Sequence, residues 1–349
     1  MIVVPVKVLI IDDSALAREI LMKGLSGYND IQVIGTASDV FEGRDKIVLL
    51  KPDVLTLDIE MPKMDGVEFI KRLIPQYSIP IVVVSSVASD NAQVTLDALD
   101  YGAVDYIQKP SAQSGRKLVD MIDELQKKII CASTVEVNAV KRNYSYIPGK
   151  RKKAIHGKEE KVIVIGASTG GTIALRKMLE EFPSDMPGCV IVQHMPAGFT
   201  KMFAKRLNKT CLVEVKEAED GDRVKRGLVL ISPGDRQIFL KKKGEKYIVN
   251  CTISEPVNGH CPSVEPLFDS AAQNSGSNTI GVMLTGMGSD GANAMVRLKK
   301  SGARTIAQDK ETSVVFGMPF EAYKRGGAEL LLPINKITDQ ILFFLKDME

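Results

Sequence analysis

The sequence predicts an α/β protein with two doubly wound parallel sheets joined by a linker. At 349 residues the chain is longer than one ordinary domain. In both halves, short β-branched apolar runs alternate with amphipathic segments of helical period, a pattern typical of parallel sheets covered by helices. The alternation is absent between the halves. We therefore expect a first domain over residues 1–130, a linker over residues 131–160 and a second domain over residues 161–349.

Five apolar runs predict the strands of the first domain. In chain order they are KVLIID, IQVIGTAS, DVLTLD, PIVVVSS and VDYIQK. Segments of helical period separate them, so we expect a parallel sheet with both faces covered. The carboxyl ends of the strands in such a sheet share one edge, where ligands bind.

The same reasoning predicts the elements of the second domain. Its strands are VIVIG, CVIVQH, LVLISP, NTIGVMLTG and ARTIAQ, and its helices include TIALRKMLEEF, FTKMFAKRL and ANAMVRLKKSG. The segment RQIFLKKKGEKYIVNC predicts a hairpin that turns at Lys243-Gly244. The segment KITDQILFFLK predicts a final helix with one apolar face, formed by Ile337, Ile341, Phe344 and Leu345.

Composition and charge exclude several classes of protein. Hydrophobic residues make up 44% and charged residues 26%, the balance of soluble globular proteins. The net charge of +3 is too small to indicate binding to nucleic acid or membranes. No apolar run approaches the roughly 18 residues of a membrane span, and the start, MIVVPVKVLIIDD, predicts a strand rather than a secretory signal. Five cysteines without a CxxC pair indicate reduced thiols in a cytoplasmic protein: Cys131, Cys189, Cys211, Cys251 and Cys261.

The linker is rich in basic residues, which stand among Asn, Ser, Pro and Gly. They are Lys141, Arg142, Lys150, Arg151, Lys152, Lys153 and Lys158. This composition indicates a solvated connector between two domains. A basic patch that docks on an acidic partner is the alternative.

Three carboxylates and one ammonium are expected at the ligand-binding edge of the first sheet. Asp12 and Asp13 end the first strand, Asp58 ends the third, and Lys109 follows the fifth. Two like charges about 4 Å apart repel by roughly 4 kcal/mol at an effective dielectric of 20, and an oxygen-ligated cation such as Mg²⁺ would remove that cost. Asp58 then becomes a candidate nucleophile towards a phosphoryl group, whose oxygens Ser85 could bond. The alternative is that the aspartates cap the helices that follow.

Two residues of the second domain are candidates for nucleophile and base. The segment GASTGG contains the Gly-x-Ser-x-Gly pattern of a nucleophile elbow between a strand and a helix. Ser168 would lie near the helix N-terminus, which favours developing negative charge; alternatively, it caps that helix. His194 ends the next strand and could take the hydroxyl proton of Ser168, although a histidine at a strand end can also be purely structural.

The segment TGMGSDG, residues 285–291, is a third candidate site between a strand and a helix. Asp290 could orient His194, and the glycine-rich backbone could bind an oxyanion. Alternatively, Asp290 caps the helix that follows. The segment also contains GxGxxG, with Asp309 after the next strand, as in a dinucleotide-binding fingerprint. A carboxylate inside the loop that should hold pyrophosphate argues against nucleotide binding.

The stretches VLIIDDSALAR, TLDIEMPKMDGVEF, VVVSS and YGAVDYIQKP resemble a two-component receiver domain. The resemblance covers about a third of the chain and implies a flavodoxin-like fold. It implies the following roles: Asp58 as phosphoacceptor, Asp12, Asp13 and Asp58 as ligands of Mg²⁺, Ser85 as switch hydroxyl, Lys109 as its partner, and Tyr106 as switch aromatic.

The stretches IGASTGG, QHMPAGFT, ISPGD, PVNGHCPSVEPLF and MLTGMGSDGA resemble the chemotaxis receptor methylesterases of the CheB family. This resemblance implies a Rossmann-like catalytic domain that uses no cofactor for the esterase reaction. It implies a triad of Ser168, His194 and Asp290, with Thr169 beside the nucleophile, the Met287 amide and Gly288 near the oxyanion, and His260 near the site.

Together the resemblances imply a phosphorylation-activated hydrolase that demethylates glutamate γ-methyl esters of chemoreceptors and deamidates receptor glutamines. They imply a histidine kinase as phosphodonor and a receiver that covers the catalytic cleft until it is phosphorylated. We expect a monomer without nucleic-acid binding or membrane insertion. A receiver fused to a nucleotide-dependent oxidoreductase and a DNA-binding response regulator are the alternatives, although the βα-repeating second half lacks a helix-turn-helix.

Overall fold

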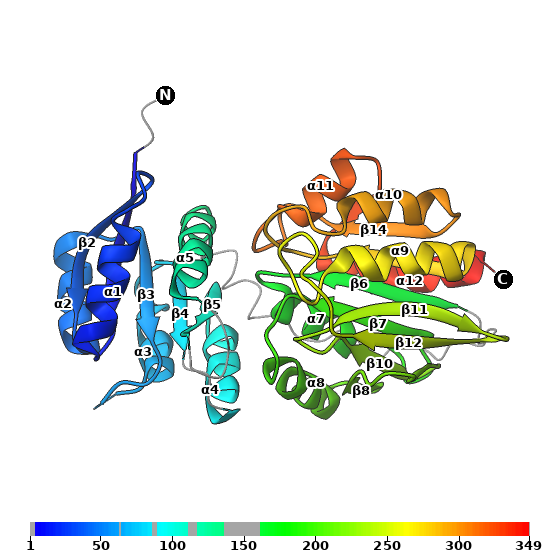
Figure 1. Ribbon diagram of the computed structural model, residues 1–349, viewed down its shortest axis with the longest axis horizontal. Helices are drawn as coiled ribbons and strands as arrows, with labels where there is room; N and C mark the ends of the chain where they lie inside the picture. The colour runs from blue at the N-terminus through cyan, green and yellow to red at the C-terminus, as the bar shows by residue number, and fades with distance from the viewer. Residues whose placement is uncertain (1–3, 63, 86–88, 111–116, 136–160, 349) are drawn as a thin grey trace. The chain divides into compact units, whose positions relative to one another are not determined.

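The computed structural model describes residues 4–62, 64–85, 89–110, 117–135 and 161–348. The chain divides into two compact units, residues 1–145 and residues 146–349 (Figure 1). Most of the predicted basic linker lies outside the described residues. Within the ranges above, none of the helices combines the length and the apolarity that crossing a bilayer requires.

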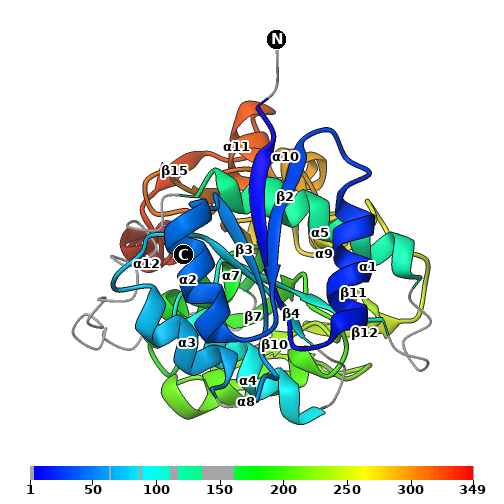
Figure 2. The same cartoon turned by 90° about the vertical axis from the view of Figure 1, so that its left-hand side faces the viewer.

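The first unit is a five-stranded parallel sheet with the order β2-β1-β3-β4-β5. Its strands are β1 (Val6–Ile11), β2 (Ile31–Ala37), β3 (Val54–Asp58), β4 (Ile81–Ser85) and β5 (Asp105–Gln108). Its helices are α1 (Ala15–Leu25), α2 (Val40–Leu50), α3 (Gly66–Leu73), α4 (Ser89–Asp100) and α5 (Leu118–Ser133). Figure 2 shows α1 and α5 on one face of the sheet and α2, α3 and α4 on the other. The strand order is that of flavodoxin-like folds, so the predicted fold class is confirmed for this half.

Burial on both faces explains why the strands of this unit are continuous apolar runs rather than alternating ones. Val8, Leu9 and Ile10 of β1, for example, are all 0% exposed. The helices begin at capping side chains that accept backbone hydrogen bonds: Ser14 for α1, Asp39 for α2 and Asp65 for α3. None of the three aspartates predicted for the acidic site caps these helices.

The second unit contains a seven-stranded parallel sheet with the order β15-β14-β13-β6-β7-β10-β8. Its strands are β6 (Val162–Ala167), β7 (Gly188–Gln193), β8 (Glu214–Glu217), β10 (Leu228–Ile231), β13 (Thr279–Met283), β14 (Arg304–Gln308) and β15 (Leu330–Leu332). The helices are α7 (Gly171–Glu180), α8 (Phe199–Thr210), α9 (Val264–Asn274), α10 (Ala292–Lys300), α11 (Met318–Lys324) and α12 (Ile334–Asp347), with a 3-10 turn over Gly276–Asn278. This half is also an α/β unit with a parallel sheet, as predicted.

A three-stranded antiparallel sheet accompanies the large one. It consists of β9 (Arg223–Val224), β11 (Gln237–Lys243) and β12 (Lys246–Thr252). The register pairs Lys243 with Lys246, and Gly244 between them has a φ of +62°, a left-handed conformation that favours glycine. The predicted hairpin is therefore confirmed. The predicted apolar face of the final helix is also buried, on α12: Ile337, Ile341, Phe344 and Leu345.

The strand order of the large sheet determines where a site can form. β6 lies at its centre, with β7 on one side and β13 on the other. The chain therefore leaves β6 in one direction and later returns to its opposite side, which makes a topological switch point. The loops that follow β6, β7 and β13 meet at the carboxyl edge of the sheet, and these loops carry Ser168, His194 and Asp290.

Candidate functional site

Ser168 lies in the turn between β6 and α7, and three hydrogen bonds to its backbone groups fix that turn. The amide of Ser168 donates to the Thr285 carbonyl at 3.0 Å. The Ser168 carbonyl accepts from the Gly171 amide at 2.7 Å and from Nε2 of Gln193 at 3.0 Å. Because these bonds hold the backbone, the hydroxyl of Ser168 points in a defined direction without being used to build the turn.

His194 connects the serine to a carboxylate. Its Nδ1 lies 3.1 Å from Oγ of Ser168, and its Nε2 lies 2.8 Å from Oδ2 of Asp290. Both distances are those of ordinary hydrogen bonds. With Asp290 ionised, Nε2 carries the proton and donates it to the carboxylate, which leaves the Nδ1 lone pair to accept from the Ser168 hydroxyl. This tautomer is the one that a general base requires.

The carboxylate of Asp290 is buried, 4% exposed, and accepts hydrogen bonds from several groups besides His194. Oδ1 accepts from the Ser263 hydroxyl at 2.7 Å and from Nδ2 of Asn258 at 2.8 Å, while Oδ2 also accepts from the Val264 amide at 2.7 Å. Val264 is the first residue of α9, so the carboxylate also lies at the positive end of a helix dipole. Burial raises the pKa of Asp290, but the bonds from His194, Asn258 and Ser263 outweigh it and hold the pKa well below its usual range. Asp290 is therefore a fixed negative charge.

The capping alternatives for Ser168 and Asp290 do not describe these helix ends. The N-cap of α7 is Gly170, with a φ of +76°, and the N-cap of α10 is Gly291, also with a φ of +76°. Neither helix has a side-chain capping bond at its N-terminus. The side chains of Ser168 and Asp290 face His194 instead.

The loop after β13 passes very close to Ser168. A Cβ at Gly286 would lie 2.8 Å from Cβ of Ser168, so this position requires glycine. The Gly286 carbonyl accepts from the amides of Gly317 and Met318, at 3.1 Å and 2.8 Å, which holds the loop in place. Among the described residues, the neighbouring Met287 amide donates no hydrogen bond to the protein.

The other residues predicted near the nucleophile occupy the same surroundings. Thr169 is buried, and its carbonyl accepts from the Thr285 hydroxyl at 2.9 Å. Gly288 is exposed and has a φ of +81°. The ring of His260 stacks on the ring of His194, with centroids 3.8 Å apart and planes 13° apart.

The dinucleotide-binding alternative finds little support in the contacts of its two carboxylates. Asp290 lies inside the GxGxxG loop and bonds His194. The carboxylate of Asp309 accepts hydrogen bonds from the amide of Thr312 at 3.0 Å and from the Thr312 hydroxyl at 2.6 Å. These bonds stabilise the turn over residues 309–312. Neither carboxylate is free for a ribose.

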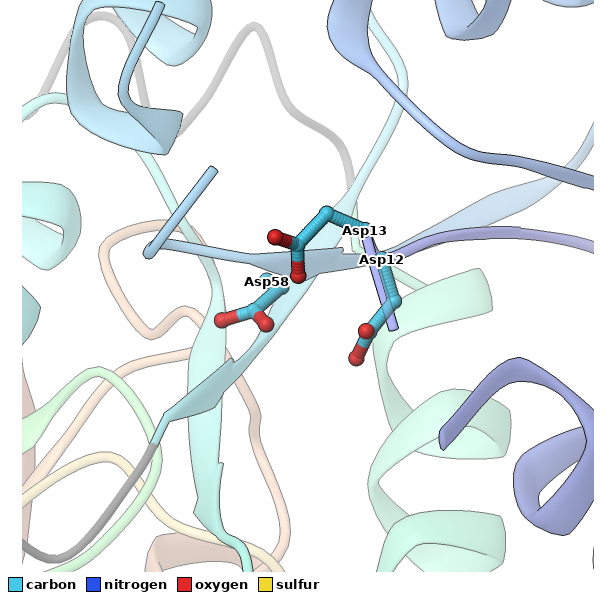
Figure 3. Close-up of side chains that lie close together, drawn as sticks. All are labelled: Asp12, Asp13 and Asp58. Carbon is cyan, nitrogen blue, oxygen red and sulfur yellow. The ribbon is translucent and has the colours of Figure 1, made fainter. Parts of the chain in front are cut away.

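A second candidate site lies at the carboxyl edge of the first unit's sheet. Figure 3 shows the carboxylates of Asp12, Asp13 and Asp58 close together, and one oxygen of each lies within 4.8 Å of the others. Nζ of Lys109 lies 2.9 Å from Oδ2 of Asp12 and 2.6 Å from Oδ2 of Asp58. Three carboxylate oxygens so close together fit the ligand preference of Mg²⁺.

Electrostatics at this second site come from burial and from opposed charges. Burial raises the pKa of Asp58, and the charge of Asp12 adds to the effect, whereas Lys109 and the Glu60 amide lower it; the net pKa lies above the usual value. Burial lowers the pKa of Lys109, but the two carboxylates outweigh burial and raise it. The ammonium is therefore charged and is held between the two buried aspartates.

The predicted switch residues lie beside this pair. Ser85, 2% exposed, ends β4, and its hydroxyl accepts from the Thr95 hydroxyl at 2.8 Å. Its carbonyl accepts from the Lys109 amide at 2.8 Å. The side chain of Tyr106 is buried, and Nζ of Lys128 lies 5.2 Å from the centre of its ring. The ring therefore lies inside the unit in this conformation.

Comparisons with known proteins agree with both halves. Residues 163–341 match the family model described as CheB methylesterase, and residues 8–123 match the response regulator receiver domain. The protein-glutamate methylesterase/protein-glutamine glutaminase of Syntrophotalea carbinolica is 51% identical over 98% of this chain and 98% of its own length. The chain belongs to the CheB methylesterase family. The Sulfurimonas denitrificans protein of the same name is 47% identical over 98% of this chain and 99% of its own length.

A solved structure supports the fold of the catalytic half of this CheB family member. The Thermotoga maritima CheB methylesterase catalytic domain shares 43% sequence identity, with a TM-score of 0.52. The alignment covers 54% of this chain and 99% of that domain. The resemblance to the CheB family stated from the motifs is thereby confirmed.

The sequence did not predict the groups that hold Asp290. Asn258 and Ser263 come from the segment between β12 and α9, and the Val264 amide comes from the first residue of α9. Two signals in the segment point to local structure: Asn-Gly, which favours a tight turn, and Ser followed by Val-Glu, which favours a helix start. Neither signal says which distant carboxylate the segment contacts.

Proposed function

We propose that this chain is a phosphorylation-activated protein-glutamate methylesterase that releases methanol from glutamate γ-methyl esters of chemoreceptors. The hydrogen-bonded series Ser168–His194–Asp290 carries the proposal. The names of the relatives give the substrate class and add deamidation of glutamine. The test is incubation of the full chain with methylated receptor, where methanol release is expected.

The reaction follows from the positions of the three side chains. Oγ of Ser168 attacks the ester carbonyl carbon while its proton passes to Nδ1 of His194. The methoxy group then leaves with that proton as methanol, which gives an acyl-enzyme. A water molecule repeats the sequence, with His194 as base, and releases the glutamate. A glutamine side chain follows the same course with ammonia as the leaving group.

Asp290 stabilises the imidazolium that forms in each half of this reaction. The bonds from His194, Asn258 and Ser263 and the α9 N-terminus hold its charge in place despite burial, so it needs no rearrangement when His194 becomes protonated. We assign the Met287 amide to the oxyanion, because it lies in the loop packed against Ser168 and has no partner among the described residues. One such donor typically contributes about 3 kcal/mol to stabilising the transition state.

We assign the first unit to control of this activity. An oxygen of Asp58 takes a phosphoryl group from a phosphohistidine of a kinase, with cleavage of the donor P–N bond. Mg²⁺ held by Asp12, Asp13 and Asp58 would offset the negative charge of the incoming group. Lys109 pairs with the new phosphate, and the hydroxyl of Ser85 bonds one of its oxygens. The added charge shifts a conformational equilibrium towards the active enzyme rather than adding new chemistry.

The proposed division is a receiver over residues 1–130, a linker over residues 131–160 and a catalytic domain over residues 161–349. Helix α5, which ends at Ser133, extends slightly beyond the first of these boundaries. Proteolysis of the native protein should cut first within the linker if this division is correct.

Replacing Asp290 with asparagine should lower kcat for methanol release by about 10³- to 10⁴-fold. The amide cannot stabilise the imidazolium, and its NH₂ group can turn towards Nε2 and favour the wrong tautomer of His194. Asp269→Asn is a matched control, because Asp269 pairs with Arg297 on the surface. Equal kcat of the Asp290→Asn variant and the wild type would show that Asp290 has no role in the reaction.

A further inference from the structure

The segment that follows β12 makes a tight turn at Val257–His260. The Val257 amide donates to the His260 carbonyl at 2.9 Å, and the His260 amide donates to the Val257 carbonyl at 2.9 Å. Asn258 and Gly259 between them have φ values of +53° and +80°. Two central residues with positive φ are the mark of a type I′ hairpin turn, for which Asn-Gly is the preferred sequence.

This turn, Val257–His260, contacts both Asp290 and His194. Nδ2 of Asn258 donates to Oδ1 of Asp290 at 2.8 Å, and the ring of His260 stacks on that of His194. Gly259 separates the two contact residues. A rigid two-residue turn therefore sets the positions of both contacts at once.

A buried glutamine anchors the turn to the sheet. Gln237, at the start of β11, is 0% exposed. Its Nε2 donates to the His260 carbonyl at 2.8 Å, and its Oε1 accepts from the Ser263 amide at 2.8 Å. The backbone on which His260 stands is thus fixed independently of the catalytic residues.

The stack adds to the restraint that the hydrogen bonds place on the ring of His194. The bonds to Ser168 and Asp290 lie at the two nitrogen atoms, and because hydrogen bonds tolerate departures of tens of degrees from linearity, they restrain the tilt of the ring only loosely. The terminal torsion of a histidine is broad, so the plane of the ring must be set by packing. A parallel ring 3.8 Å away, at 13°, sets that plane.

We propose that His260 is a positioning residue that holds the imidazole plane of His194 during proton transfer. The inference rests on the proposed function, since His194 is the base of that reaction. In this role His260 acts through the ring of His194, on which it stacks, rather than on the hydroxyl or the ester. A planar aromatic ring at position 260 is what the role requires, rather than the nitrogen atoms of histidine.

Three variants of the full chain test this role. His260→Ala should lower kcat for methanol release by about 10- to 100-fold, with little change in KM, because proton transfer depends on alignment. His260→Phe keeps a flat ring and should retain activity within about threefold of the wild type, while His260→Leu, bulky but not flat, should resemble His260→Ala. Unchanged kcat in His260→Ala, or equal losses in His260→Phe and His260→Ala, would overturn the proposal.

Glycine substitutions test the contribution of the turn itself. Gly259 and Gly244 both have positive φ, and a Cβ at either would meet nothing within 4 Å. Alanine at either position therefore introduces similar backbone strain, but only Gly259 lies in the turn that holds His260. Gly259→Ala should lower kcat by about tenfold and Gly244→Ala should not; equal kcat in the two variants counts against the proposal.

The rate of Ser168 labelling by a fluorophosphonate separates this inference from the proposed function. The probe reports activation of the serine whether or not a methyl ester is the substrate. Slower labelling in His260→Ala than in His260→Phe supports the positioning role, and equal rates refute it. A wild-type protein that is labelled but releases no methanol would refute the proposed substrate and leave the comparison of labelling rates intact.

Discussion

Replacing Ser168 with alanine is expected to abolish methanol release, with a loss of kcat on the order of 10⁴- to 10⁶-fold. Oγ of Ser168 forms the covalent bond to substrate in the proposed reaction, and no other group can replace it. The substitution removes only the hydroxyl, whereas the turn is held by backbone bonds of residue 168 and by the side chain of Gln193. The fold should therefore persist.

Ser184→Ala is a suitable control, because Ser184 is exposed and belongs to the same unit. Methanol release from methylated receptor and the thermal midpoint should be measured for both variants and the wild type. A Ser168→Ala protein with the wild-type rate would refute the nucleophile assignment.

Replacing Asp58 with asparagine is expected to abolish activation by phosphorylation. A small-molecule phosphodonor with Mg²⁺ should raise the esterase rate of the wild type by about 5- to 150-fold, the usual range of coupling between two sites. Asparagine removes the carboxylate oxygen that accepts the phosphoryl group. The variant should keep the basal rate and show no response to the phosphodonor.

Asp45→Asn is the matched control for charge, since Asp45 is exposed on α2 and pairs with its neighbour Arg44. It should respond to the phosphodonor as the wild type does, and omission of Mg²⁺ should prevent that response. Full activation of the Asp58→Asn variant would overturn the assignment of Asp58 as the phosphoacceptor.

The sequence predicted the long elements of the fold because those elements are regular. Buried parallel strands need continuous apolar runs, and the β11–β12 hairpin has Gly244 at the position that requires positive φ. Shorter elements were not predicted. β9 has two residues, β15 is an apolar run of only three residues, and β8 is partly exposed with charged residues along it, so none shows the longer apolar pattern of the other strands.

Two helices of the second unit were not predicted because each contains a proline. α9 contains Pro266 and α11 contains Pro319, residues that ordinarily end a helical pattern. Both prolines lie in the first turn, where the missing amide hydrogen is not needed for an intrahelical bond. Position within the helix, which the pattern alone does not reveal, decides that these prolines are tolerated.

The candidate triad could be assembled from the sequence because its members follow three strands whose ends share one edge. The hydrogen-bond donors around Asp290 could not be predicted in the same way. Its donors Asn258 and Ser263 come from an irregular segment whose place depends on the packing of the small antiparallel sheet and on the anchoring by Gln237. The Asn-Gly sequence predicts the turn, but it does not predict that the turn contacts Asp290.

The most direct measurement of the central claim is the site and rate of covalent modification by a fluorophosphonate, followed by peptide mass spectrometry. The claim is that His194, oriented by Asp290, makes the hydroxyl of Ser168 nucleophilic. We expect a single adduct, on Ser168, and slowing of the reaction by at least about 10³-fold in a folded His194→Gln variant. An adduct on another residue, or equal labelling of Ser168 in the wild type and His194→Gln, would contradict the claim.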